Sequence, residues 1–98
     1  MWILQGGGKN TAGMTFRIKS GGVKTVGRAT RADFIVDAAL VSRLHCRLEA
    51  EDERLNVVDL DSTNGTWVNG RRVERARLAD GDRLRLGRIE LTVSQQSN

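Results

Sequence analysis

The sequence predicts an all-β domain, built either as an antiparallel sandwich or as a small barrel. Apolar and polar residues alternate through most of the chain, as they do in strands with one buried and one solvated face. Glycine-containing turn signals separate these stretches at short intervals, which is typical of many short antiparallel strands. No stretch of about a dozen residues has the three-and-four apolar spacing of an amphipathic helix.

The N-terminal half carries the clearest alternation. A first strand precedes Gly6, and alternating apolar residues predict a second strand over 14–18. The turn Ser20-Gly21-Gly22 then leads into a strand over 23–27. Residues 44–49 alternate again, so that Leu44, Cys46 and Leu48 are expected to face the core.

The C-terminal half consists of shorter strands joined by tight turns. Strands are predicted over 55–60, 67–68, 72–73, 83–86 and 89–93, and Trp67 is assigned to the core. Asn69-Gly70 is a strong hairpin signal because both residues tolerate positive φ. The segments 79–82 and 87–88 are further turns, 6–11 is a glycine-rich loop or bulge, and 94–98 is a polar tail.

Length and composition indicate one domain over residues 1–98. A chain of 98 residues with 39% hydrophobic and 29% charged residues has apolar material for one core. No apolar run approaches the roughly 20 residues of a membrane span, and Met1–Leu4 is too short for a signal-peptide core. The single cysteine, Cys46, excludes an internal disulfide. We therefore expect a cytoplasmic domain without membrane contact.

The net charge of +4 comes from 16 basic and 12 acidic residues, and thirteen of the basic residues are arginines. Arginine binds phosphate or carboxylate through two parallel hydrogen bonds, although a high arginine content also arises from a GC-rich genome. The charge therefore permits phosphate-bearing ligands without choosing among them.

Motifs for catalysis, metal and nucleotide binding are incomplete. Lys9 lacks the glycine spacing and the following helix of a phosphate-binding P-loop. Counting an EF-hand loop from Asp59 places Asn64 at its glycine position and Gly70 at its glutamate position. Ser42 and His45 lie three residues apart, and no third group nearby orients the imidazole. We expect no enzymatic activity, no metal and no cofactor.

Polar residues concentrate instead in turns between the predicted strands. They form the strings Gly27-Arg28, Ser42-Arg43-Leu44-His45 and Ser62-Thr63-Asn64-Gly65-Thr66. Polar groups on loops of a rigid sheet are the usual arrangement of a binding surface. Two guanidinium groups, hydroxyls and an amide supply donors that suit a phosphate dianion.

These strings resemble the signature blocks of forkhead-associated (FHA) domains. The third block continues through Trp67-Val68-Asn69-Gly70, and 80–87 is similar to the closing pattern of the family. The likeness runs from about Gly27 to Val93. The resemblance implies a β-sandwich of two sheets whose loops at one end bind phosphothreonine-containing segments of a protein partner. A Ser/Thr kinase is then implied upstream, and nucleic acid is not expected.

The resemblance also implies a role for each site residue. Arg28 and Ser42 would contact the phosphate, Arg43 would add a phosphate or peptide contact, and Thr63 would add a phosphate-side hydrogen bond. Asn64 would hold the peptide backbone. Gly27 and Gly65 would provide backbone turns, and His45 would brace the loops from beneath. The apolar Leu40 and Val41 favour an aliphatic residue a few positions after the phosphothreonine.

Other interpretations of the same residues stay open at this point. Arg28 and Arg43 can be solvated charges, and Ser42, Thr63 and Asn64 can simply form turns. The domain as a whole can be a protein-interaction scaffold that needs no phosphate. A nucleic-acid-binding β-domain would use the arginines against a phosphate backbone, but only four aromatic residues are present.

Overall fold

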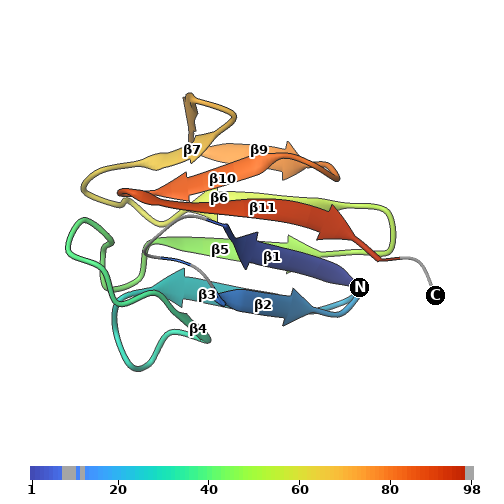
Figure 1. The fold of residues 1–98 in the computed structure, drawn as a ribbon, viewed down its shortest axis with the longest axis horizontal. Coiled ribbons are helices and arrows are strands. Elements are labelled where there is room, and N and C mark those ends of the chain that lie inside the picture. Colours follow the sequence, from blue (N-terminus) through green and yellow to red (C-terminus); the bar gives the residue numbers. More distant parts are fainter. Residues whose placement is uncertain (8–10, 12, 97–98) are drawn as a thin grey trace.

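The computed structural model describes residues 1–7, 11 and 13–96. Within this part of the chain there are eleven strands and no helix (Figure 1). The strands are β1 (Trp2–Gly6), β2 (Thr15–Ile18), β3 (Val23–Gly27), β4 (Phe34–Ile35), β5 (Cys46–Ala50), β6 (Leu55–Asp59), β7 (Thr66–Val68), β8 (Arg71–Val73), β9 (Arg75–Leu78), β10 (Arg83–Leu86) and β11 (Ile89–Gln95).

The strands form a sandwich of two sheets, which confirms the predicted fold class. One sheet has the order β2-β1-β11-β10-β7-β8, and the other has the order β4-β3-β5-β6-β9. Paired neighbours are antiparallel except β3 and β4, which run parallel. The hairpin of β7 and β8 is confirmed: Val68 pairs with Arg71, and Asn69 and Gly70 both have positive φ.

The structure adds two strands to those predicted and moves two strand boundaries. The strands β4 and β9 were not predicted. The strand expected over 44–49 starts only at Cys46, so His45 precedes it and is fully buried instead of facing solvent. The last strand continues past Val93 to Gln95, and the Gln96 amide donates to the Met1 carbonyl at 2.8 Å. Of the glycine-rich loop at 6–11, residues 8–10 lie outside the described residues, as do 97–98 of the predicted tail.

The core fills the space between the two sheets. Inward-facing residues of β1, β5, β6, β10 and β11 are fully or almost fully buried, as the alternation predicts. The rings of Phe16 and Phe34 stack with centroids 4.8 Å apart and pack, partly buried, against this cluster. Buried side-chain N and O atoms of the described residues all have hydrogen-bond partners.

The assignment of Trp67 to the core is wrong. Its neighbours Thr66 and Val68 are buried, so the pleat turns the Trp67 side chain to the outer face of the sheet. There it pairs with Arg72 on β8 and Arg85 on β10. The tryptophan of the core is Trp2, which is 2% exposed.

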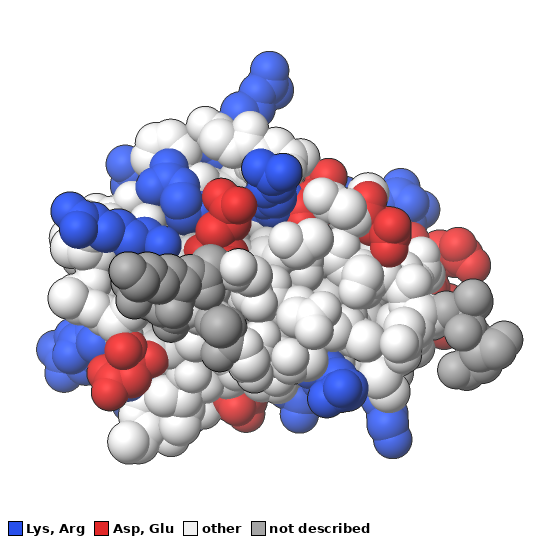
Figure 2. Space-filling model, in the orientation of Figure 1, with Lys and Arg blue, Asp and Glu red and all other residues white. Residues whose placement is uncertain are grey.

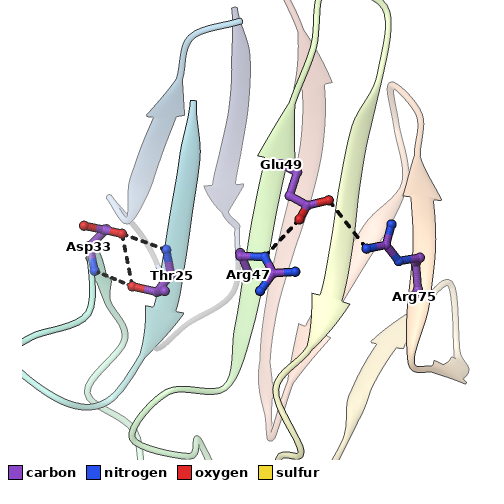
Figure 3. Close-up of polar contacts among 5 residues, drawn as sticks. All are labelled: Thr25, Asp33, Arg47, Glu49 and Arg75. Carbon is purple, nitrogen blue, oxygen red and sulfur yellow. Dashed lines mark hydrogen bonds and ion pairs between the residues drawn. The ribbon is translucent and has the colours of Figure 1, made fainter. Parts of the chain in front are cut away.

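The outer face of the second sheet is polar. Arg47 contacts Glu49 at 2.9 Å, and Arg75 lies 3.8 Å from the other oxygen of the same carboxylate (Figure 3). Near the start of β4, the Asp33 carboxylate accepts hydrogen bonds from the amide and hydroxyl of Thr25 (Figure 3). The outer faces of both sheets are therefore exposed to solvent, as expected for a sandwich with a single core.

Strand direction separates the loops into two ends. The strands β3, β6 and β10 end at the left of Figure 1, so the segments after Gly27, Asp59 and Leu86 lie at one end. The β5–β6 and β9–β10 turns lie at the opposite end, with the start of β1 and the end of β11. These two turns contain acidic residues at positions 51–53, 80 and 82, and Figure 2 shows red side chains beside blue ones at this end.

Candidate functional site

Three loops meet at the end of the sandwich where β3 and β6 finish. Arg28 directly follows β3, Ser42 precedes β5, and Thr63 and Asn64 lie between β6 and β7. Together they surround a small open cavity of about 170 Å³, which we call the cup. It is lined by Arg28, Ala39, Leu40, Val41, Ser42, Thr63 and Asn64.

The first side of the cup is fixed by hydrogen bonds between Arg28 and the segment at 41–42. The Arg28 amide donates to the Ser42 carbonyl, and Arg28 Nε donates to the Val41 carbonyl, both at 3.0 Å. Using Nε in this way anchors the guanidinium group, so its terminal N–H groups remain for a ligand. Glycine at position 27 allows the backbone of β3 to lie close to the backbone of Arg43, because a Cβ on Gly27 would overlap the Arg43 carbonyl oxygen.

The second side of the cup joins the segment at 40–42 to the loop at 63–64. The Thr63 amide donates to the Ser42 hydroxyl oxygen at 3.1 Å. The Asn64 side-chain amide donates to the Leu40 carbonyl at 3.0 Å. Because the Ser42 hydroxyl accepts in this contact, its own hydrogen is available to an anionic oxygen.

His45 lies beneath the cup and connects the same two loops. Its Nδ1 accepts a hydrogen bond from the Ser42 amide at 3.0 Å, so its Nε2 carries the proton and donates to the Gly65 carbonyl at 2.8 Å. Gly65 has φ +88°, which a side chain rarely tolerates. The buried imidazole thus sets the separation of the two loops.

Asp59, the last residue of β6, holds the loop that carries Thr63 and Asn64. It was not among the site residues predicted from the sequence. Its carboxylate accepts from the hydroxyls of Ser62 and Thr66 at 2.5 and 2.7 Å, and the Ser62 hydroxyl accepts from the Gly65 amide. Burial raises the pKa of Asp59, but the hydrogen bonds from Ser62 and Thr66 outweigh it and leave the pKa below its usual value. The spacing Asp-x-x-Ser-x-x-x-Thr is a sequence signal, since aspartate favours such local turns.

Trp67 was also missed as a supporting residue, because it was assigned to the core. Its indole Nε1 donates to the Asn64 carbonyl at 3.1 Å, and the Arg85 guanidinium lies 4.6 Å from the centre of its ring. Arg85 in turn donates to the Gly87 carbonyl at 3.2 Å. The outer face of the sheet therefore supports the loop that carries Asn64.

Arg43 stands apart from the site, and Val41 contributes its backbone to the cup while its side chain is buried. Arg43 is exposed but does not line the cup; its backbone carbonyl accepts from the Ala29 amide at 3.0 Å. Val41 is 2% exposed, so its side chain belongs to the core and only Leu40, at 40%, offers an apolar surface. Leu40 also lines a neighbouring hollow of about 430 Å³ with Met14 and Ile89.

The arrangement suits an anion with several oxygens. The cup brings together a guanidinium group, two hydroxyls and a carboxamide, all of which donate hydrogen bonds. No group of three or more His, Cys, Asp or Glu residues among those described is placed to hold a metal ion. None of the described segments forms a helix able to cross a membrane.

Comparison with known proteins identifies similar chains. The FHA domain family model matches residues 24–87. The glycogen accumulation regulator GarA of Mycobacterium tuberculosis is 39% identical over 69 residues, which make up 70% of this chain and 43% of that protein. The chain thus spans less than half of this relative's length.

Solved structures are similar over nearly the whole chain. One, from a study of phosphothreonine-dependent FHA domain interactions, has a TM-score of 0.89 and 34% identity and covers 99% of this chain and 98% of its own. A second is the FhaA FHA domain complexed with the intracellular domain of Rv3910. It has a TM-score of 0.85 and 35% identity and covers 95% of this chain and 99% of its own.

Proposed function

Because the chain belongs to the forkhead-associated domain family, we propose that it binds phosphothreonine-containing segments of a protein partner and acts as a signalling or assembly adaptor. The observation that carries this proposal is the convergence of Arg28, Ser42, Thr63 and Asn64 on one cup. A phosphothreonine brings almost two negative charges and three acceptor oxygens, which match the donors of the cup.

Each residue of the cup has a role in this proposal. The terminal N–H groups of Arg28 and the Ser42 hydroxyl bind the phosphate, and the Thr63 hydroxyl adds a third hydrogen bond. The Asn64 side chain exchanges its contact with the Leu40 carbonyl for one with the peptide backbone. Arg43 contacts a more distant part of the peptide, since it stands outside the cup. Gly27, His45 and Gly65 hold the loops in place.

The affinity follows from a few charged hydrogen bonds. Each contributes roughly 1.5–3 kcal/mol. Three or four of them, less the cost of ordering a flexible peptide, correspond to a dissociation constant of about micromolar. Loss of the phosphate removes most of this energy, so the interaction is reversible by a phosphatase and requires a Ser/Thr kinase. We propose a cytoplasmic adaptor without catalytic activity.

Substitution of Arg28 tests the proposal. Calorimetric titration with a phosphothreonine peptide should give about micromolar affinity for the wild-type chain, and Arg28→Ala should weaken it at least tenfold because the main phosphate donor is lost. Arg31→Ala is the matched control, since Arg31 is exposed on the loop that follows Arg28 but does not line the cup.

Two results would contradict this function. Equal binding of the phosphorylated and unphosphorylated peptides would remove the requirement for phosphate. Partner binding that survives both phosphatase treatment and Arg28→Ala would instead support a phosphate-independent interaction scaffold.

A further inference from the structure

The outer face of the first sheet carries a basic surface around an aromatic residue. The register places Arg72, Trp67, Arg85 and Glu90 in one row across β8, β7, β10 and β11. Arg83 lies two residues before Arg85 on β10 and so shares this face, whereas Arg71 pairs with the buried Val68 and faces the other side of the sheet. We call this surface the Trp67 face; it comprises Trp67, Arg72, Arg83 and Arg85.

Positive charge on the Trp67 face is only partly neutralised. Arg83 lies 3.9 Å from the Glu90 carboxylate, with both side chains more than half exposed. Arg72 is exposed and forms no ion pair with any described residue. Three arginines against one glutamate make this surface basic, and Figure 2 shows blue side chains along the upper part of the face that contains β10.

The composition of the Trp67 face is that of a protein interface. Tryptophan and arginine are the residues most enriched among those that dominate binding energy. The Trp67 ring is half-buried, and Arg85 covers it at 4.6 Å, so the ring and its guanidinium form one rigid platform. The carboxylates of an acidic peptide segment complement such a platform.

The Trp67 face is continuous with the cup. The Trp67 indole donates to the Asn64 carbonyl, and the Arg72 side chain packs where a Cβ on Gly65 would lie, with Nε 2.6 Å from that position. A peptide held at Asn64 therefore adjoins Trp67 and Arg72, and Arg85 and Arg83 follow along the same face toward the start of β10.

We propose that the Trp67 face binds acidic residues that flank the phosphothreonine in the partner protein. This inference rests on the proposed function, since the phosphothreonine anchors the segment in the cup. A nucleic-acid strand is the less suitable occupant. Glu90 interrupts the basic row, and Arg85 covers a face of the indole against which a base would stack.

Three phosphothreonine peptides test the proposal: a short one, the same peptide with Asp/Glu extensions at both ends, and a matched one with Asn/Gln extensions. At low ionic strength the acidic extensions should tighten binding to the wild-type chain about tenfold relative to the amide extensions. This gain should shrink in 0.5 M salt, because exposed charges are screened.

The variant Arg83→Glu should remove most of the gain and leave the affinity for the short peptide within about twofold. The control is Arg75→Glu on the opposite sheet. It matches in charge and in contacts, since Arg75 lies 3.8 Å from Glu49 much as Arg83 lies 3.9 Å from Glu90. The control should keep the full gain.

The outcomes separate this surface from the cup. If the short peptide binds but the acidic extensions add nothing, or Arg83→Glu and Arg75→Glu lose the gain equally, the Trp67 face is not a peptide surface and the cup stands. Failure of the short peptide to bind overturns the proposed function and this inference together. Binding of an oligothymidine that is tighter than binding of the acidic peptide, and that is lost in Arg83→Glu but not in Arg75→Glu, would assign the face to nucleic acid.

Discussion

At the residue scale, the geometry of the cup depends on a few buried polar groups that fix exposed ones. His45 is fully buried and links Ser42 to Gly65, while Asp59 collects the hydroxyls of Ser62 and Thr66. Such networks make a loop rigid because each unsatisfied partner would carry a desolvation penalty. Donors that are already in place lose little conformational entropy when a ligand binds.

Replacement of Asp59 by Asn tests this network through pH. Hydrogen bonds to the carboxylate lower the pKa of Asp59 in the folded chain, so the charged form stabilises the fold. That contribution is present above the unfolded pKa of about 3.9 and is lost as pH falls through the lower folded value. Asp59→Asn should reduce the free energy of unfolding by about 1 kcal/mol at pH 7 in urea titrations.

The difference in the free energy of unfolding between the wild-type chain and Asp59→Asn should then shrink when the urea titrations are repeated at acid pH. A difference that stays constant from pH 7 down to pH 3 would mean that the charge on Asp59 plays no part in holding the loop.

The sequence signals of the site differ in strength from residue to residue. The alternating pattern marked the polar blocks between the strands, and the resemblance to the FHA family implied which of their residues, Arg28, Ser42, Thr63 and Asn64, would face the ligand. Trp67 could not be placed, because a strand of three residues is too short for its alternation to define a face. Only the pairing of Trp67 with Arg72 and Arg85 decides that it points outward.

At the element scale, the longer strands were predictable and the short ones were not. Strands such as β10 and β11 alternate over enough residues to define a buried face. The two-residue β4 lies parallel to β3. This pairing forms because the loop at 28–33 brings the chain back beside β3, and local alternation cannot predict such a contact. The alternation Arg75-Ala76-Arg77-Leu78 in β9 was a usable signal that was overlooked, since Ala76 packs against the core and Leu78 is buried.

A tryptophan at each end of the sandwich gives a matched test of how elements support the cup. The Trp67 indole donates to the Asn64 carbonyl, and the Trp2 indole donates to the Glu51 carbonyl at the opposite end, at 3.1 and 3.0 Å. Trp67→Phe should weaken phosphopeptide binding about fivefold in calorimetry, because loss of one hydrogen bond costs about 1 kcal/mol and releases the Asn64 loop.

Trp2→Phe should lower the midpoint of thermal unfolding, since Trp2 lies in the core, yet leave peptide affinity within about twofold. Equal effects of the two substitutions on affinity would show that Trp67 acts only through general stability and does not position Asn64.

At the scale of the whole molecule, the fold separates stability from recognition. The core between the sheets is made by strands, while the cup is made by the loops after β3, before β5 and after β6. Figure 2 shows basic and acidic side chains mixed over the visible surface, so the net charge alone does not direct a partner. The arginines of the cup and of the Trp67 face attract an anionic segment locally.

The most direct test of a phosphate-binding cup is a titration of the isotopically labelled chain with a phosphothreonine peptide, followed by amide chemical shifts in NMR spectra. The largest changes should fall on Arg28, Ser42, Thr63 and Asn64, with residues 51–54 and 79–82 at the far end unchanged, and the unphosphorylated peptide should produce almost none. Changes centred on the far end, or equal changes with both peptides, would contradict the assignment.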